Sequence, residues 1–335
     1  MRSDYMSFIS DFKNSLSTLD AHAFEEAALL LFRFQAGQNP VYRDYLSYLR
    51  TNPEKVGSLE QIPFLPIEFF KTHQVVSHFF QPETIFLSSG TTLQQRSQHL
   101  VAETAFYKHH AQLLFEDSFG PLAGCVVLGL LPSYLEQGNS SLVMMVDHFI
   151  QATGQQEEGF YLDNHTALRG AVAGARRAGK NVYLFGVTYA LLDLADQLEP
   201  GEFSNVTVFE TGGMKGRRRE MVREELHQQL TRAYGVGEIH SEYGMTELLS
   251  QAYSKGHGLF NPSRTLKVLV RDVNDPFAVT TGPGSGGINV IDLANVDSCA
   301  FIETKDLGKL HENGTFEVLG RFDNSDIRGC NLLVG

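Results

Sequence analysis

Five consecutive residues of the sequence place four hydroxyl groups around one glycine. They are Ser88, Ser89, Gly90, Thr91 and Thr92, and they follow an apolar run at 85–87. A strand that ends in such a loop gathers backbone N–H groups and hydroxyls around one small volume, and these donors suit an anion such as phosphate. The segment is a weak signal by itself, because a loop rich in Ser, Thr and Gly is more often only a loop.

A second group of residues that could do chemistry follows a strand candidate at 237–240. It consists of Tyr243, Gly244, Thr246 and Glu247. The tyrosine ring can stack on a purine, the glycine allows close approach of the backbone, Thr246 can donate to a phosphate, and Glu247 can hold Mg²⁺ through oxygen. The structural alternative is a turn that leads into a helix, with Thr246 or Glu247 capping its N-terminus.

A glycine pair and a late carboxylate form the third and fourth groups. Gly212 and Gly213 follow another strand candidate, where they would let a flat ring approach the backbone, although an ordinary strand-to-helix turn explains them too. Asp306, which we expect at a turn, could accept both hydroxyls of a ribose, and Arg321 could donate to the ribose or to a phosphate. A β-hairpin with its turn at 312–314 is expected here whether or not the site exists.

The bulk properties of the chain narrow the possible classes of function. Of its 335 residues, 42% are hydrophobic and 20% charged, which is ordinary for a globular protein with one large domain and subdomains, or with two domains. The formal net charge of −12 argues against general nucleic-acid binding. No stretch is apolar enough to span a bilayer and the N-terminus has no signal core, so we expect a cytoplasmic protein.

Apolar periodicity predicts an α/β fold. Helices are expected within 5–50, and strands then alternate with helices, which favours a mostly parallel sheet flanked by helices. The strand candidates are 125–130, 181–186 and 205–210, and the helix candidates are 142–150, 189–198 and 217–233. After residue 265, short strands joined by turn residues predict a small antiparallel β subdomain. Its strand candidates are 266–270, 287–291, 299–303 and 314–319.

The four chemical groups, in this order, resemble the adenylate-forming enzymes, which include acyl-CoA synthetases, luciferases and peptide-synthetase adenylation domains. In that family the first loop contacts the phosphates of ATP, the tyrosine stacks on adenine, the Thr-Glu pair serves phosphate and Mg²⁺, and the late aspartate holds the ribose. The resemblance implies these roles for Thr91, Thr92, Tyr243, Thr246, Glu247 and Asp306.

The chain departs from the family pattern at three places. The first loop lacks its usual lysine, for which Arg96 is the nearest stand-in. The sequence ends at Gly335, fourteen residues after Arg321, so we expect no C-terminal lid domain and no lid lysine. The residues after Arg321 also differ from the usual hinge. The resemblance then implies a helical segment at 1–60, an α/β core for nucleotide and acyl group at 61–264, and a β-rich subdomain with a tail at 265–335.

A narrower resemblance, to the acyl-protein synthetase (LuxE-like) branch, accounts for these departures. The matching stretches are 62–66 with Phe70 and Lys71, 131–135 with 140–143, 211–213 with 215–217, 250–253, and 328–330. Members of this branch activate a carboxylic acid as acyl-AMP, transfer the acyl group to a cysteine near their own C-terminus, and pass it on to a partner reductase.

Cys330 is the residue that this resemblance singles out. The nearby Arg328 would lower the pKa of its thiol and favour the nucleophilic thiolate. The alternative is a small, semi-buried hydrophobic residue that docks the tail, and both interpretations stay open. Cys125 and Cys299 lie in apolar strand patterns, so we expect them in the core, and the three cysteines have no metal or disulfide spacing.

Two further basic or imidazole groups are candidates. Lys215, or Arg217 beside it, could replace the missing lid lysine, although most charges of 215–219 fit a solvated helix start paired with the glutamates that follow. His99, which we expect on a helix after the first loop, is kept as a possible phosphate or substrate contact. The other histidines, including His109, His110 and His240, are expected to be structural.

The resemblance implies a reaction in two steps. A carboxylic acid, expected to be fatty or otherwise apolar, reacts with ATP and Mg²⁺ to give acyl-AMP and pyrophosphate. The acyl group then passes to a thiol, first Cys330 and then a partner protein such as a reductase or carrier, and its pocket is placed by analogy near 107–150 and 185–190. Two alternatives stay open: a CoA ligase of the phenylacetate type, in which free CoA is the acceptor, and a non-catalytic nucleotide- or acyl-binding module.

Overall fold

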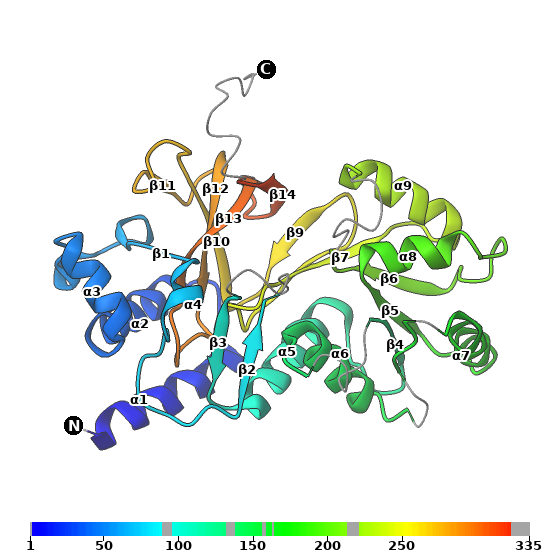
Figure 1. Ribbon diagram of the computed structural model, residues 1–335, viewed down its shortest axis with the longest axis horizontal. Helices are drawn as coiled ribbons and strands as arrows, with labels where there is room; N and C mark the ends of the chain where they lie inside the picture. The colour runs from blue at the N-terminus through cyan, green and yellow to red at the C-terminus, as the bar shows by residue number, and fades with distance from the viewer. Residues whose placement is uncertain are drawn as a thin grey trace.

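The computed structural model describes residues 2–88, 96–131, 138–155, 159–162, 164–212 and 221–322, with the backbone alone at 2–4. Strands in these ranges form a 12-stranded mixed sheet and a separate two-stranded hairpin of β2 (Thr84–Leu87) and β3 (Gln98–Val101). Figure 1 shows the helices α1–α3 beside β10, β12 and β13 at one end of the sheet, and α6–α9 around β4–β7 at the other.

The parallel part of the sheet consists of β4 (Val126–Leu130), β5 (Val182–Gly186), β6 (Val206–Glu210) and β7 (His240–Tyr243), which lie side by side in chain order. Every residue of β4 and β5 is buried, as is typical of parallel strands that are covered on both faces. The expected α/β fold is therefore confirmed. β7 begins at His240, so the strand expected at 237–240 is wrong in its bounds, and Tyr243 belongs to the strand instead of the loop after it.

Helices cover both faces of this parallel part. Most buried apolar side chains of α5 (Thr104–Phe119) and α6 (Ser141–Ala152) belong to one cluster. Those of α7 (His165–Arg177), α8 (Thr188–Ala195) and α9 (Arg223–Tyr234) belong to a second cluster. The first cluster is rich in aromatic rings. Every helix in the described part of the chain is too short or too polar to span a bilayer.

The remaining strands continue the sheet in antiparallel pairs, apart from β1, which pairs parallel to β13. In spatial order from β7 they are β8 (Ala252–Ser254), β9 (Leu259–Pro262), β14 (Phe316–Arg321), β13 (Phe301–Leu310), β12 (Gly284–Asp292), β10 (Leu266–Arg271) and β11 (Val279–Thr280), with β1 at Leu65–Pro66. The strands expected after residue 265 are present, and the antiparallel part is larger than the pattern predicted. The parallel part of the sheet therefore ends at β7, and the antiparallel part begins where β8 pairs with β7.

The N-terminal helices pack on the antiparallel part. They are α1 (Arg2–Ser15), α2 (Phe24–Gln38), α3 (Pro40–Tyr48) and α4 (Phe69–Thr72), with short 3₁₀ turns at Leu16–Thr18, Pro53–Lys55 and Leu59–Gln61. Asn39 caps α3 by accepting a hydrogen bond from the N–H of Tyr42 at 3.1 Å. The buried Gln35 amide donates to the carbonyl of Asn295 at 2.7 Å and accepts from the N–H of Ala300 at 2.9 Å. Buried amides thus fix α2 on the loop between β12 and β13.

One predicted helix begins later than expected. The pattern predicted a helix over 217–233, whereas α9 starts at Arg223 and ends at Tyr234. Met221 and Val222 are not helical, and 217–220 lie outside the described residues. The apolar spacing of Leu226 and Leu230 identified the helix correctly, but the run of charged residues before it carries no apolar period that would mark its start.

Candidate active site

The hydroxyl-rich segment 88–92 connects β2 to β3. At its base, the N–H of Ser88 donates to the carbonyl of Ser97 at 3.1 Å, and the N–H of Ser97 donates to Ser88 Oγ at 2.9 Å. Arg96 turns back on this base, where its Nε donates to the carbonyl of Ser88 and its Nη2 to that of Leu87. The stand-in role proposed for Arg96 therefore competes with a structural one. Ser89, Gly90, Thr91 and Thr92 lie outside the described residues.

Thr246 and Glu247 lie beside this hairpin in an irregular segment. The carbonyl of Thr246 accepts from Nδ1 of His99 at 2.9 Å, and the carbonyl of Glu247 accepts from the Asn295 amide at 2.8 Å. No helix follows them, so the alternative of a capped helix N-terminus is wrong. His99 lies on β3 and not on a helix, because the chain returns along β2 after the loop. It is buried, and its contact with Thr246 holds the backbone there.

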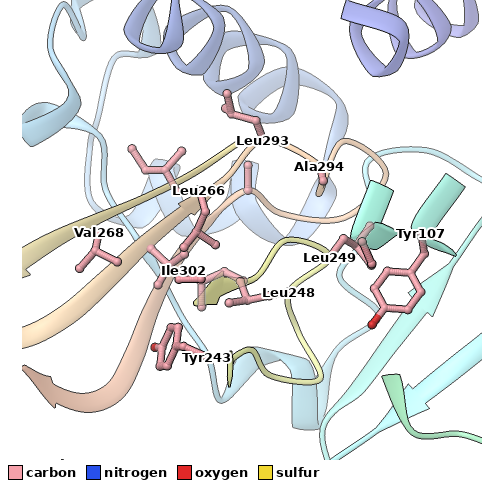
Figure 2. Close-up of a cluster of buried hydrophobic side chains, with 14 of the residues drawn as sticks. Tyr107, Tyr243, Leu248, Leu249, Leu266, Val268, Leu293, Ala294 and Ile302 are labelled. Carbon is pink, nitrogen blue, oxygen red and sulfur yellow. The ribbon is translucent and has the colours of Figure 1, made fainter. Parts of the chain in front are cut away.

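One buried hydrogen-bond network anchors the same segment. Asp292 accepts from the N–H groups of Leu249 and Ser250 at 2.7 and 3.0 Å, and from the Ser250 hydroxyl at 2.6 Å. His110 Nε2 lies 3.1 Å from that hydroxyl, and burial lowers the pKa of His110 to about 4. Figure 2 shows Leu248 and Leu249 pointing into the buried cluster that also contains Ala294 and Ile302. The expectation that His110 is structural is met by these contacts.

Burial dominates the electrostatics of Glu247. The side chain is 4% exposed, and its burial raises the pKa of the carboxyl above the ordinary value. The Ser97 hydroxyl, and at longer range the charges of Arg321 and Lys71, act in the opposite direction. A desolvated carboxylate whose described hydrogen bonds are to the Ser97 hydroxyl and to its own backbone is favoured by a cation that reaches it. Glu247 therefore fits an oxygen ligand for a hard cation such as Mg²⁺.

Tyr243 of β7, Asp306 of β13 and Arg321 of β14 form one cluster of contacts. The Tyr243 hydroxyl donates to Asp306 Oδ2 at 3.0 Å, and Arg321 Nε lies 3.5 Å from Asp306 Oδ1. The Tyr243 ring packs on those of Phe260 and Phe316, with centroids 5.9 and 5.3 Å away. Three residues that the sequence placed in two separate groups are thus in direct contact.

The backbone around Asp306 is a β-bulge and not the turn that we expected. β13 runs unbroken from Phe301 to Leu310, but its pairing with β12 shifts near Asp306, and its pairing with β14 shifts between Leu307 and Gly308. Thr304 Oγ1 accepts from the N–H of Asp306 at 3.1 Å inside this irregularity. Burial raises the pKa of Asp306, while Arg321 and the Tyr243 hydroxyl lower it. Bulges re-aim side chains, and this one lies at the carboxylate that contacts Tyr243 and Arg321.

Gly212 follows β6 at the same end of the sheet. Its φ of +79° is the left-handed region that glycine adopts without strain. Its N–H donates to Glu210 Oε1 at 2.7 Å, and its carbonyl accepts from the N–H of Thr188 at 3.0 Å. Burial alone would raise the pKa of Glu210, but hydrogen bonds from His227, Thr188 and Gly212 hold it below the ordinary value. Gly213 and Lys215 lie outside the described residues.

Of the three cysteines, two lie in the hydrophobic core and one lies outside the described residues. Cys125 and Cys299 are buried, with 7% and 0% exposure, and burial raises the pKa of the Cys299 thiol to about 12. Their predicted place in the core is confirmed. Cys330 lies outside the described residues. Within the described ranges, no three His, Cys, Asp or Glu side chains form a group that could hold a metal ion by themselves.

Sequence reasoning missed three residues of this site. Ser97 lies beside the Glu247 carboxylate, Asn295 holds its carbonyl, and Glu242 shares the strand with Tyr243. Ser97 lies close in sequence to the first loop, and Glu242 precedes Tyr243. Both positions could therefore have been identified from the sequence. Asn295 lies in a loop with no motif, so nothing in its neighbourhood marked it.

Solved structures with this fold are acid–CoA ligases of the adenylate-forming type. A 2-hydroxyisobutyryl-CoA ligase, in complex with its acyl-AMP and CoA, matches with a TM-score of 0.64 and 13% identity over 93% of this chain and 78% of that one. ATP-bound MatB from Rhodopseudomonas palustris matches with a TM-score of 0.53 and 16% identity over 73% of this chain and 50% of that one. The O-succinylbenzoate CoA synthetase MenE from Bacillus subtilis, with AMP, gives 0.51 and 17% over 73% and 50%.

These comparisons establish the fold. The central sheet flanked by helices, with a small subdomain of strands near the C-terminus, is that of adenylate-forming enzymes. The chain spans about half the length of the MatB and MenE structures. No protein-family model and no curated protein matches the sequence.

Proposed function

We propose that this chain activates a carboxylic acid with ATP, forming an acyl-adenylate and pyrophosphate. The observation that carries this proposal is the contact of Asp306 with both Tyr243 and Arg321, beside the buried carboxylate of Glu247. An aromatic ring, a ribose acceptor and a cation ligand then lie close together. MenE with ATP and a magnesium ion is among the structures that share the fold.

The nucleotide contacts follow from the chemistry of these side chains. Asp306 accepts hydrogen bonds from the two ribose hydroxyls, and Arg321, whose side chain is 71% exposed, reaches toward the ribose or the α-phosphate. Tyr243 and Gly212 border the adenine from β7 and β6. Thr91 and Thr92, together with Thr246, donate to the phosphates.

The chemical step needs charge stabilisation more than proton transfer. A carboxylate oxygen of the acid attacks the α-phosphorus, a new P–O bond forms, and pyrophosphate leaves with the electron pair of the broken bond. Mg²⁺, when bound, neutralises charge on the phosphates. Glu247 holds that cation, and Thr246 orients a phosphate oxygen through its hydroxyl. His99 and Asn295 fix the backbone of both residues, so the donors are in place before the reaction begins.

The second step transfers the acyl group to a thiol. Cys125 and Cys299 are unsuited because both are buried and both have a raised pKa. This leaves Cys330 as the acceptor within the chain, followed by a partner protein such as a reductase or carrier, or else free CoA, as in the ligases with this fold. Lys215 is the side chain that we propose for the lid lysine's task.

Pyrophosphate exchange into ATP, measured across a panel of carboxylic acids, tests the first step. Asp306→Asn and Glu247→Gln should each lower the exchange rate by about 10²-fold or more, since they remove the ribose acceptor and the cation ligand. Asp44→Asn changes a carboxylate that is 68% exposed and should leave the rate unchanged. The absence of exchange with every acid, despite measurable ATP binding, would favour a non-catalytic module instead.

Acceptor identity requires a separate experiment. Incubation with a labelled acid and ATP should leave label on the full chain, and Cys330→Ser should abolish it, while Cys299→Ser should not. Label that appears only in added CoA would assign the CoA-ligase alternative. Lys215→Ala should slow adenylation without changing the unfolding transition, and an unchanged rate would remove Lys215 from the mechanism.

A further inference from the structure

Glu242 places a carboxylate in the interior next to the proposed adenylation site. It precedes Tyr243 on β7, so its side chain lies on the opposite face of the sheet from Tyr243. Its cross-strand partner is Tyr253 on β8. Its charge is felt by Tyr107 of α5 and by Tyr253, so the carboxylate faces the layer between the sheet and α5.

This carboxylate has no partner among the described residues. No hydrogen bond or ion pair joins it to any side chain in the described ranges, although it is only partly exposed. Burial, together with the nearby Glu210, raises the pKa of Glu242 to about 8. Among the described residues, the groups whose charges couple to Glu242 are a second carboxyl, Glu210, and the phenols of Tyr107 and Tyr253. A desolvated carboxyl in such surroundings is stabilised by an incoming positive charge.

The backbone leaves room for this side chain. A Cβ atom at Gly244 would collide with Glu242 Oε1, so glycine at this position lets the carboxylate lie against the turn after β7. Gln251 Cγ lies 3.7 Å from the same point. The carboxylate and the Gln251 side chain thus border one small volume at the end of the parallel strands.

Gln251 Oε1 is a second hydrogen-bond acceptor with no donor among the described residues. The residue is 3% exposed, and its Oε1 has no hydrogen-bond partner in the described structure. Its Nε2 is used, donating to the carbonyl of Leu249 at 3.3 Å. A buried acceptor left open costs free energy, and most such atoms in proteins are paired. Gln251 Oε1 and the Glu242 carboxylate, neither with a partner among the described residues, favour a ligand that brings several donors.

The interior behind Glu242 is filled with aromatic rings. Phe115, Phe149, Phe185, Phe209 and Tyr253 are each at most 2% exposed. Phe115 contacts the other four, with ring centroids between 5.0 and 5.9 Å. A long apolar chain could enter this layer only by displacing side chains that already pack closely.

We propose that Glu242 selects the substrate of the proposed reaction: a small carboxylic acid that carries an ammonium group, which binds between Glu242 and Gln251. This inference rests on the proposed function and replaces the fatty or apolar acid expected from the sequence. The ammonium offers three donors and a positive charge, so it pairs with the carboxylate and donates to Gln251 Oε1.

Matched pairs of acids test the proposal by pyrophosphate exchange with the full chain. Each pair differs by an ammonium in place of a methyl group: glycine with propanoate, L-alanine with 2-methylpropanoate, 3-aminopropanoate with butanoate, and 4-aminobutanoate with pentanoate. In at least one pair, kcat/KM should favour the amino acid by about tenfold or more. Glu242→Gln should bring that ratio close to one. Glu238→Gln, on the same segment but 45% exposed, should preserve it.

Two results would overturn the proposal while leaving the proposed function intact. One is a preference for the methyl compound in every pair, and the other is an amino-acid preference that Glu242→Gln does not change. If no acid supports exchange, the proposed function fails, and calorimetric binding of the same amino acids then decides the role of Glu242. Binding that Glu242→Gln abolishes would support the ammonium site, and no binding to the unmodified chain would refute it.

Discussion

Replacing Glu242 with glutamine should change how the stability of the ligand-free chain depends on pH. The pKa of this carboxyl is about 8 in the folded chain, against an ordinary value of 4.5. Below pH 4.5 both folded and unfolded chains hold the proton. Between 4.5 and 8 the folded chain keeps a proton that the unfolded chain has released, so the unmodified protein loses stability as the pH rises. Glutamine cannot ionise, so the Glu242→Gln chain does not lose this stability as the pH rises.

The size of this effect follows from the two pKa values. Each unit between them is worth about 1.4 kcal/mol, so Glu242→Gln should gain up to roughly 5 kcal/mol relative to the unmodified chain across this window. The gain should begin near pH 4.5, grow steadily, and level off above pH 8. The contributions of all other ionisable groups cancel, to first order, in the difference between the two chains.

Urea unfolding followed by far-UV circular dichroism, at pH 5, 6, 7, 8 and 9, measures the difference. Glu54→Gln changes an exposed carboxylate and should give a difference that does not depend on pH. A flat difference for Glu242→Gln as well would refute the reasoning, because it would mean that Glu242 is ionised and paired in the folded chain. An ammonium ligand should shift the unmodified chain toward higher stability at neutral pH and leave Glu242→Gln unaffected.

Three further predictions concern the contacts around the site. Tyr243→Phe removes the hydrogen bond to Asp306 and should raise KM for ATP about fivefold to tenfold in the exchange assay, with a loss of about 1 kcal/mol in unfolding free energy; an unchanged KM would separate Asp306 from the nucleotide. His99→Leu leaves the buried carbonyl of Thr246 unpaired and should cost about 1–3 kcal/mol in urea unfolding, and equal stability would show that the bond contributes nothing. Asp292→Ala removes the acceptor of several buried donors and should cost about 3–5 kcal/mol, with the lost melting temperature as the readout.

The fold was largely predictable because its signals are local. Apolar runs identified β4, β5 and β6. The larger antiparallel part escaped because strand pairing across long sequence distances, such as β9 with β14, leaves no local trace. The start of α9 escaped because charged residues before Arg223 fit a helix or a loop equally well.

For the site too, one part was predictable from the sequence and another was not. Residue types marked Tyr243, Glu247 and Asp306, and the structure brings Tyr243 and Asp306 together across 63 positions of sequence. The environment of these groups could not be predicted. Whether a buried carboxylate is hydrogen-bonded, like Glu247, or has no partner among the described residues, like Glu242, depends on elements that close around it only after folding. The bulge at Asp306 likewise depends on its pairing with both neighbouring strands.

The bulge also separates the position of Asp306 from the tip of its own hairpin. Between the bulge and the tip, Gly308 has no space for a Cβ atom because the carbonyl of Glu317 and the side chain of Ile288 already fill it, so the register there is locked. The tip around Gly314, with φ of +81°, lies beyond this lock and faces no close neighbour. A fluorophore or an inserted peptide tag at the tip would therefore leave the carboxylate where it is, and the hairpin offers a place to attach the protein to a surface or a probe without disturbing its proposed site.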